Sequence, residues 1–280
     1  QHPLMKRVAI IVNLEARGVS GPGAMFETGA GNEALIGLFG EVVPRPAANS
    51  LLYEVYRRMP NSTDFTIYSR AGVRGFNFAF SRGASLYHSE RDDLAHLALR
   101  SLQHQGESAL AVLTGAGAVS LESLRSNRDA SYVDVGTRAL LAWPVNWNLP
   151  MALAALLLVA AIVCWRASLR AGQLVWALLA VGALLACLPL SGWWLSWPLG
   201  RWPGAHPLDH PYPWPGRIAL IAMSLLVVLA IARWFGSRAG MRATLCVSWM
   251  LLGLLALALA FLMPGAAFLP LAPLIAFIVF

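Results

Sequence analysis

The sequence is short of charged residues and of cysteine, and both shortages limit what the protein can be. Charged residues make up 12% of the 280 residues, whereas soluble domains carry roughly 25%, so the composition argues against an ordinary soluble globule. The three cysteines, Cys164, Cys187 and Cys246, all lie within or beside apolar segments. They resemble small packing residues, and neither a disulfide framework nor a cysteine-based zinc site is expected in the rest of the chain.

Several functional motifs are missing as well. The chain contains no GxSxG nucleophile elbow and no P-loop, and Gly18, Gly21 and Gly23 have neither the order nor the spacing of a dinucleotide-binding fingerprint. His206 and His210 are four residues apart, but the surrounding prolines prevent the helix that would align the two rings. An interfacial loop is therefore favoured over a metal site there.

The positive charge of the chain belongs to its second half. A net charge of +7 is a feature of many nucleic-acid-binding proteins. However, residues 1–145 hold 14 Lys and Arg against 13 Asp and Glu, and residues 146–280 hold seven arginines against one acid. Since the excess accompanies the apolar half and no basic patch marks the first half, nucleic-acid binding is not expected.

Long apolar segments in the second half predict a membrane region over residues 141–280. Each is near the ~20 residues that cross the ~30 Å hydrocarbon layer of a bilayer, and four in succession argue against buried helices of a soluble protein. No acid or base interrupts their apolar cores, which makes an ion-coupled transporter or channel the least expected function. The expected spans are about 149–165, 172–197, 218–235 and 243–263, with a partial fifth span at 266–280.

Orientation follows from the arginines of the short loops. Arg166 and Arg170 lie between the first two spans, Arg233, Arg238 and Arg242 flank the turn between the third and fourth, and neither loop contains an acid. Loops rich in Arg and Lys stay in the cytoplasm, so the preceding domain is expected outside the cytoplasm. One lysine against twenty arginines hints at a high-GC bacterial genome, and the expected location is the periplasmic side of a bacterial inner membrane.

Residues 1–140 have the pattern of an α/β domain. The apolar, β-branched run Val8–Leu14 predicts a strand buried on both faces. Phe65–Tyr68 and Phe76–Phe80 predict two further strands, and residues 131–142 either a final strand or a segment leading into the membrane. We expect a partial mixed, largely parallel sheet with flanking helices, followed by an all-α region of four to five membrane helices.

Helices are expected at residues 32–42, 50–58 and 101–114. Asn49 and Ser50 are plausible caps for the second of these. His96 and His104 are expected on or beside helices as solvent-facing residues. The apolar face of the third helix is expected to consist of Leu102, Ala109, Leu110 and Leu113.

Two candidate site residues follow predicted strands. Glu15 follows the first strand, and His88 follows the strand Phe76–Phe80, at the carboxyl ends where functional residues of such sheets gather. A carboxylate and an imidazole are ligands of hydrolytic zinc sites. From the residues alone, the favoured explanation for Glu15 is a carboxylate paired with Arg17 or capping a helix, and that for His88 is an ordinary loop histidine.

Five strings, taken in order, carry a family resemblance. Together they resemble the C-terminal part of the peptidase domain of membrane-bound zinc metallopeptidases of the aminopeptidase Y type. Vacuolar membrane proteases, the endoplasmic reticulum metallopeptidase and their bacterial counterparts are similar in this respect. The strings are NLEARGVSGPGAMFETG (13–29), YEVYRRMPNSTDF (53–65), FNFAF (76–80), YHSERDD (87–93) and SLQHQGESALAV (101–112).

The resemblance implies a two-zinc exopeptidase that acts on peptides. It implies that Glu15 binds one zinc ion and His88 the other. It also implies supporting positions for Asp92 and Asp64, although both are equally explained as helix-capping or surface residues. Tyr87 is in a position to hydrogen-bond a tetrahedral intermediate, although an aromatic residue packed beside the site is the favoured explanation for it.

The chain departs from the family pattern in one respect. The family also requires an earlier histidine, a bridging aspartate and a Glu-Glu pair that includes the general base, and nothing in this chain supplies them. We therefore expect a fragment that is inactive by itself, with both ends cut. The alternative is a non-catalytic membrane interaction protein that retains a peptidase-like binding module. The oligomeric state does not follow from the sequence.

Overall fold

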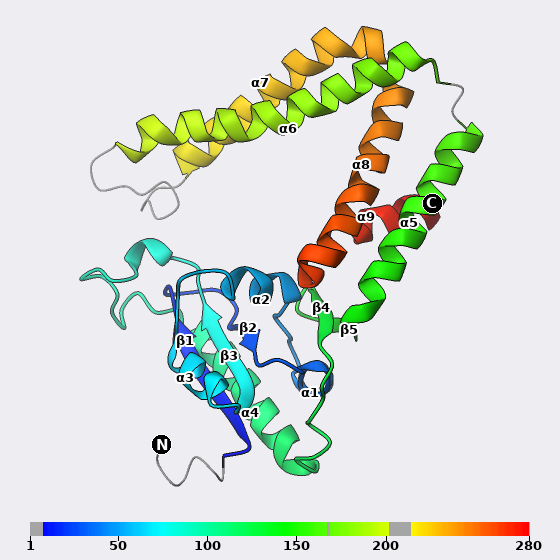
Figure 1. The fold of residues 1–280 in the computed structure, drawn as a ribbon. Coiled ribbons are helices and arrows are strands. Elements are labelled where there is room, and N and C mark those ends of the chain that lie inside the picture. The colour runs from blue at the N-terminus through cyan, green and yellow to red at the C-terminus, as the bar shows by residue number, and fades with distance from the viewer. Residues whose placement is uncertain (1–7, 167–168, 202–213, 280) are drawn as a thin grey trace. The chain divides into compact units, whose positions relative to one another are not determined.

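The computed structural model describes residues 8–166, 169–201 and 214–279. The chain divides into two compact units, Gln1–Met151 with Ala258–Leu269, and Ala152–Leu257 with Pro270–Phe280. The first contains the strands and shorter helices, and the second is helical (Figure 1). The expected fold class, an α/β region followed by apolar helices, is confirmed.

A three-stranded sheet organises the first unit. Its order is β1 (Ile10–Ala16), β3 (Arg74–Phe80) and β2 (Ala24–Thr28). β1 is parallel to β3, with Glu15 opposite Ala79, and β2 is antiparallel to β3. The sheet is mixed, as expected, and only its β1–β3 pair is parallel. The segments that leave the carboxyl ends of β1 and β3 therefore start from the same edge of the sheet.

The burial expected for β1 was wrong. Its residues Ile10–Asn13 are only half-buried and Leu14 is 52% exposed. Among the described strands β1 has one neighbour, β3, so its other edge and part of its surface are left uncovered. The two strands lie close together because Gly75 has no side chain: a Cβ there would lie 1.9 Å from the carbonyl oxygen of Ile11.

The helices around the sheet begin largely where the sequence predicts. Asn49 caps the second of them, since its Oδ1 accepts a hydrogen bond from the backbone N–H of Leu52 at 3.0 Å. The run Phe65–Tyr68, however, lies in a helix and not in a strand. The Thr63 N–H donates to Thr66 Oγ1 at the start of that helix, and a four-residue apolar run alone does not distinguish helix from strand. These helices are α1 (Glu33–Val42), α2 (Ser50–Tyr56), α3 (Asp64–Arg70) and α4 (Leu99–Ala118).

The buried face of α4 is not the one predicted. Leu102, Leu110 and Leu113 are 51%, 67% and 50% exposed, and of the expected apolar face only Ala109 is buried. The helix instead turns a small and polar stripe inward, which includes His104 and Gln105. His104 is thus buried and not solvent-facing: its Nδ1 accepts from the Gly23 N–H at 3.2 Å and its Nε2 contacts the Arg45 carbonyl oxygen at 3.0 Å. His96 is half-buried in the loop before α4.

A second sheet and a common core complete this unit. β4 (Ala130–Val135) and β5 (Ala139–Pro144) form an antiparallel hairpin, so residues 131–142 are two strands joined by a turn and not one final strand. A bridge between Asn49 and Val133 connects this hairpin to the segment before α2. The buried core comprises Met25, Leu35, Ile36, Leu38, Phe39, Val43, Ala48, Phe76, Phe78, Val112, Ala116, Leu124, Ala130 and Tyr132.

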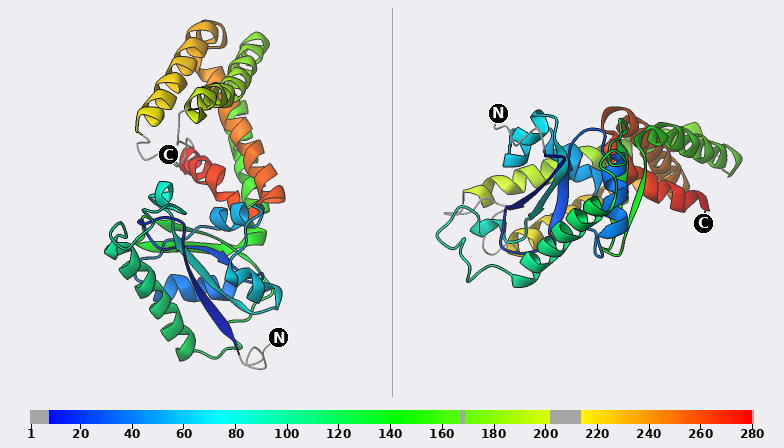
Figure 2. Two further views of the ribbon diagram at one scale, coloured as in Figure 1. Left: turned by 90° about the vertical axis from the view of Figure 1, so that its left-hand side faces the viewer. Right: turned by 90° about the horizontal axis from the view of Figure 1, so that it is seen from below.

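The second unit consists of apolar helices. Within the described ranges, four helical segments are long and apolar enough to cross a membrane, and they coincide with the four expected spans. α6 and α7 run side by side (Figures 1 and 2), and the expected partial fifth span corresponds to a helix of 12 residues, α9. His206 and His210 lie outside the described residues. The helices are α5 (Asn148–Arg166), α6 (Ala171–Gly200), α7 (Trp214–Ala239), α8 (Met241–Leu262) and α9 (Phe268–Val279).

Candidate functional site

The candidate site lies at the sheet edge where β1 and β3 end. Beyond these ends the two chain segments stay together, because Ser20 and Arg82 form an antiparallel bridge. A Cβ on Gly18 would lie 2.4 Å from the Arg82 carbonyl oxygen, so this approach requires glycine. The loop that carries His88 therefore starts at the same edge as Glu15 (Figure 1).

Glu15 is held by contacts from its own strand and from α4. Its carboxylate Oε1 accepts a hydrogen bond from Asn13 Nδ2 at 3.0 Å, and its backbone oxygen accepts one from Gln105 Nε2 at 2.9 Å. Asn13 and Glu15 are two residues apart on one strand, so their side chains point to the same face of the sheet. The position of Glu15 is thus fixed through both its backbone and its side chain.

A row of polar side chains crosses the sheet beside Glu15. Asn77 on β3 is fully buried, and its Nδ2 donates to Glu27 Oε2 at 2.8 Å and to Thr63 Oγ1 at 2.9 Å. Its Oδ1 accepts from Asn13 Nδ2 at 2.9 Å. The register explains the row, since Asn13 and Glu27 both lie opposite Asn77. Two amides therefore connect the carboxylates of Glu15 and Glu27.

Glu27 is a half-buried carboxylic acid in this row. Burial raises the pKa of the Glu27 carboxyl above its ordinary value, and the hydrogen bond from Asn77 offsets only part of this effect. Carboxyl groups with perturbed pKa values cluster at functional sites. Glu27 is therefore a member of the candidate site, adjacent to Glu15 through the asparagines.

Tyr87 and His88 lie in the exposed loop after the short 3-10 helix η2 (Ala84–Leu86). Their rings stack with centroids 3.8 Å apart and an interplanar angle of 21°. His88 has a positive φ of 57°, which is unusual outside glycine and turns the chain sharply at this residue. Tyr87 is 38% exposed, so the pair presents an open imidazole at the loop.

The two aspartates implied by the resemblance are both exposed. Asp64 is in the first turn of α3, where a negative charge favours the helix dipole. Asp92 lies in the loop after His88, and its backbone N–H donates to the Ser89 carbonyl oxygen at 3.0 Å. A supporting role at a metal site remains a prediction for both residues.

The described residues do not by themselves form a complete zinc centre. Among them no group of three or more His, Cys, Asp or Glu side chains is placed to hold a metal ion, whereas a catalytic zinc ion takes about three protein ligands. Glu15 and His88 supply the expected donor types, one carboxylate and one imidazole, from neighbouring strand ends. Their assignment as zinc ligands stays a prediction.

Asn13, Asn77 and Glu27 are site residues that the sequence patterns do not single out. One signal was available: Asn77 is the polar residue inside the apolar string FNFAF, and a polar residue buried in a strand needs a hydrogen-bonding partner. Which partner it finds depends on the strand register, which the sequence does not show.

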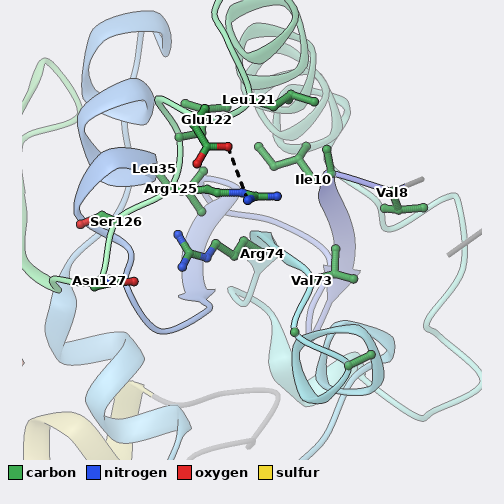
Figure 3. A pocket seen from close by; sticks show the side chains of 14 residues that line it. Val8, Ile10, Leu35, Val73, Arg74, Leu121, Glu122, Arg125, Ser126 and Asn127 are labelled. Carbon is green, nitrogen blue, oxygen red and sulfur yellow. Dashed lines mark ion pairs between the residues drawn. The ribbon is translucent and has the colours of Figure 1, made fainter. Parts of the chain in front are cut away.

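A hollow of about 650 Å³ lies at the opposite end of β1 and β3 (Figure 3). It is lined by Val8, Ile10, Arg74 and Arg125 among others, and its one acidic lining residue, Glu122, pairs with Arg125 at 3.4 Å. Glu15 lies five positions beyond Ile10 along β1, which corresponds to roughly 17 Å. This hollow is therefore distinct from the Glu15 edge, and its lining contains a single carboxylate and neither histidine nor cysteine.

Comparison with known proteins gives a family likeness for the region that holds the polar row. The family model described as peptidase family M28 matches residues 1–113. Residues 1–113 are thus similar to peptidase family M28 and are called the M28 region below. This M28 region contains β1 to β3 and all the candidate site residues, from Glu15 to Asp92.

Relatives of the chain are named as a membrane protease and a metallopeptidase. A vacuolar membrane protease from Eremothecium gossypii is 29% identical over 173 residues, 57% of this chain and 17% of that protein. Endoplasmic reticulum metallopeptidase 1 from Mus musculus is 34% identical over 116 residues, 40% of this chain and 13% of that protein. The expected resemblance is confirmed, and the chain spans less than a fifth of the length of either relative. No solved structure gives a significant match.

Proposed function

We propose that the protein is a membrane-anchored, zinc-dependent exopeptidase of the aminopeptidase type. The observation that carries this proposal is the M28 match over residues 1–113 followed by four helices apolar enough to cross a membrane. Two relatives support it by name, a vacuolar membrane protease and an endoplasmic reticulum metallopeptidase. Peptides would be the substrates, and the lipid bilayer would hold the second unit.

The proposed location is a bacterial inner membrane with the M28 region on the periplasmic side. Two observations support it. The short loops expected to face the cytoplasm contain arginine and no acid. The chain also prefers arginine to lysine by twenty to one.

The roles proposed for individual residues follow the donor types at the sheet edge. Glu15 and His88 would each supply one ligand to neighbouring zinc ions, and the remaining ligands and the general base would come from outside the described residues. The hydrogen bond from Asn13 engages Oε1 of Glu15 and would orient the carboxylate toward a cation, as the outer partners of metal ligands do. Asp92, Asp64 and Tyr87 are proposed as supporting residues.

The test combines zinc content with turnover of an aminoacyl chromogenic substrate by the membrane-embedded protein. Glu15→Ala and His88→Ala are expected to lower bound zinc, and to abolish turnover in a form of the protein that also carries the general base. Matched controls are Glu41→Ala, an exposed glutamate on α1, and His96→Ala, a histidine of the same loop. Turnover and zinc content that survive in Glu15→Ala and His88→Ala would refute the assignment.

One observation favours the alternative, a non-catalytic membrane interaction protein with a peptidase-like binding module. The described residues alone do not assemble three metal-binding side chains. Peptide binding without turnover by the zinc-supplied protein would support this alternative, and turnover that Glu15→Ala abolishes would exclude it.

A further inference from the structure

The turn between α8 and α9, Leu262–Ala266, is bonded to helix α2. All of these residues belong to the first compact unit. The Gly265 N–H donates to Glu54 Oε1 at 3.2 Å, and Ser50 Oγ lies 2.7 Å from the Gly265 carbonyl oxygen, to which it donates. Both backbone groups of one glycine thus bind side chains of α2, more than 200 residues earlier in the chain.

The carboxylate at this contact, that of Glu54, is buried and paired with an arginine. Glu54 is 3% exposed, and burying a carboxylate is unfavourable unless it is paired. Arg58 forms an ion pair with Glu54 and also donates from Nη2 to the Leu262 carbonyl oxygen at 3.1 Å. Arg57, by contrast, approaches Glu54 only to 3.8 Å. Arg58 therefore joins the helix and the turn.

A second set of bonds fixes the turn to the start of α5. Asn148 is fully buried, and its Nδ2 donates to the Pro264 carbonyl oxygen at 2.8 Å and to Ser131 Oγ at 2.6 Å. Its Oδ1 accepts from Trp143 Nε1 at 2.7 Å. The start of the first expected span and the end of the fourth are thus joined at one place. This is consistent with four spans, because an even number of crossings returns the chain to the same side of the membrane.

The fit of the turn depends on the absence of a side chain. A Cβ on Gly265 would lie 2.6 Å from Glu54 Cγ and 2.7 Å from the Ser50 carbonyl oxygen. The second of these atoms is backbone, so the contact does not relax by rotation of a side chain. Glycine is therefore required for this docking.

Helix α2 connects the turn to the candidate site. It packs against β2, and the Tyr56 ring meets the Phe26 ring edge-on with centroids 4.7 Å apart. Phe26 directly precedes Glu27, whose carboxylate is bonded to Asn77. A displacement of α2 would thus be transmitted to the strand that carries Glu27.

We propose that the α8–α9 turn is a brace that holds α2 within the first unit and so fixes β2 and the Glu27–Asn77 end of the polar row. The consequence for peptidase activity rests on the proposed function, whereas the brace itself does not.

The test measures hydrogen exchange in the full chain embedded in lipid nanodiscs. Gly265→Ala is expected to accelerate exchange of the amides of α2 and β2 about tenfold. Gly236→Ala is the matched control, because a Cβ there meets nothing within 4 Å. Arg58→Met, a change at a partly exposed side chain, is expected to accelerate exchange in both α2 and residues 258–269. Its neighbour Arg57→Met is expected to leave exchange within about twofold of the unmodified chain.

Unchanged exchange of α2 in both Gly265→Ala and Arg58→Met would overturn the brace. If Gly265→Ala fails to fold, the comparison of Arg58→Met with Arg57→Met tests the brace. Equal exchange rates of the α2 amides in these two variants would overturn the brace. Bound zinc is measured in parallel in the unmodified chain. Accelerated exchange of α2 in a chain that binds no zinc supports the brace and counts against the proposed function. Unchanged exchange in a chain that binds zinc overturns the brace and leaves the proposed function standing.

Discussion

Replacing Tyr132 by phenylalanine should stabilise the protein, although Tyr132 is a core residue. Tyr132 on β4 is fully buried, and no described group hydrogen-bonds its hydroxyl. In the unfolded chain water satisfies that hydroxyl, so folding loses its hydration without a replacement. Phenylalanine keeps the ring and leaves no cavity. We expect the free energy of unfolding to rise by about 1–2 kcal/mol, the desolvation term for one unpaired polar group.

The neighbouring residue provides a control of opposite sign. Ser131 is as deeply buried as Tyr132, but its hydroxyl accepts the hydrogen bond from Asn148. Ser131→Ala should therefore lower the free energy of unfolding by about 1 kcal/mol. Two deletions of one oxygen atom, at adjacent positions of one strand, are expected to act in opposite directions.

Pulse proteolysis of the detergent-solubilised chain across a urea series measures both variants. With roughly 2 kcal/mol per molar urea, the midpoint should rise by about 0.5–1 M for Tyr132→Phe and fall by about 0.5 M for Ser131→Ala. A midpoint that falls in both variants would show that the Tyr132 hydroxyl is paired, and the reasoning would be refuted.

Three further changes test other contacts. Burial lowers the pKa of His104 below its ordinary value of 6.5, so the imidazole binds a proton more readily in the unfolded chain than in the folded one. The thermal midpoint should therefore fall as the pH drops below about 6.5, and His104→Gln should remove this dependence. Gly75→Ala should lower the free energy of unfolding by roughly 3 kcal/mol through its clash with the Ile11 oxygen, while Gly37→Ala, where a Cβ meets nothing, should raise it slightly in the same urea series. Asn77→Leu should cost about 2 kcal/mol or more in that series, because Glu27 would lose its buried partner.

The membrane helices were the most predictable part of the fold. Their length and apolar composition follow from the thickness of the bilayer, and no tertiary contact is needed to recognise them. The segment Phe65–Tyr68 shows the opposite case. Its four residues fit a strand or a helix equally, and the Thr63–Thr66 contact that starts α3 is a local detail that periodicity does not report.

Helix α4 shows why the buried face of a helix is harder to predict than the helix itself. Leucine spacing indicates which side is more apolar, and Leu110 and Leu113 are nevertheless exposed. The sheet-facing side carries Gln105, whose Nε2 reaches the carbonyl oxygens of Glu15 and Phe78. Burial there is decided by hydrogen bonds to strands that are distant in sequence, and hydropathy does not contain that information.

The sequence predicts the donor types of the candidate site but not the hydrogen bonds among its side chains. Glu15 lies near the carboxyl end of β1 and His88 lies in the loop after β3, and parallel pairing brings these two strand ends to one edge. The bonds from Asn13 and Asn77 depend on the register of three strands and on a bulge in β2 between Met25 and Glu27. Register is fixed by the whole sheet, so a single sequence leaves it open.

The α8–α9 turn also sets an order for biosynthesis. Its partners on α2 are made 211 and 215 residues earlier, before any membrane helix leaves the ribosome. Until four helices have been inserted and the turn has been made, Glu54 has the ion pairs with Arg58 and Arg57 but not the hydrogen bond from Gly265. Closing so long a loop comes late in folding. The packing of α2 can therefore be completed only after the apolar helices have been inserted. If insertion failed, the Glu54 carboxylate, buried in the folded chain, would stay exposed to chaperones and proteases.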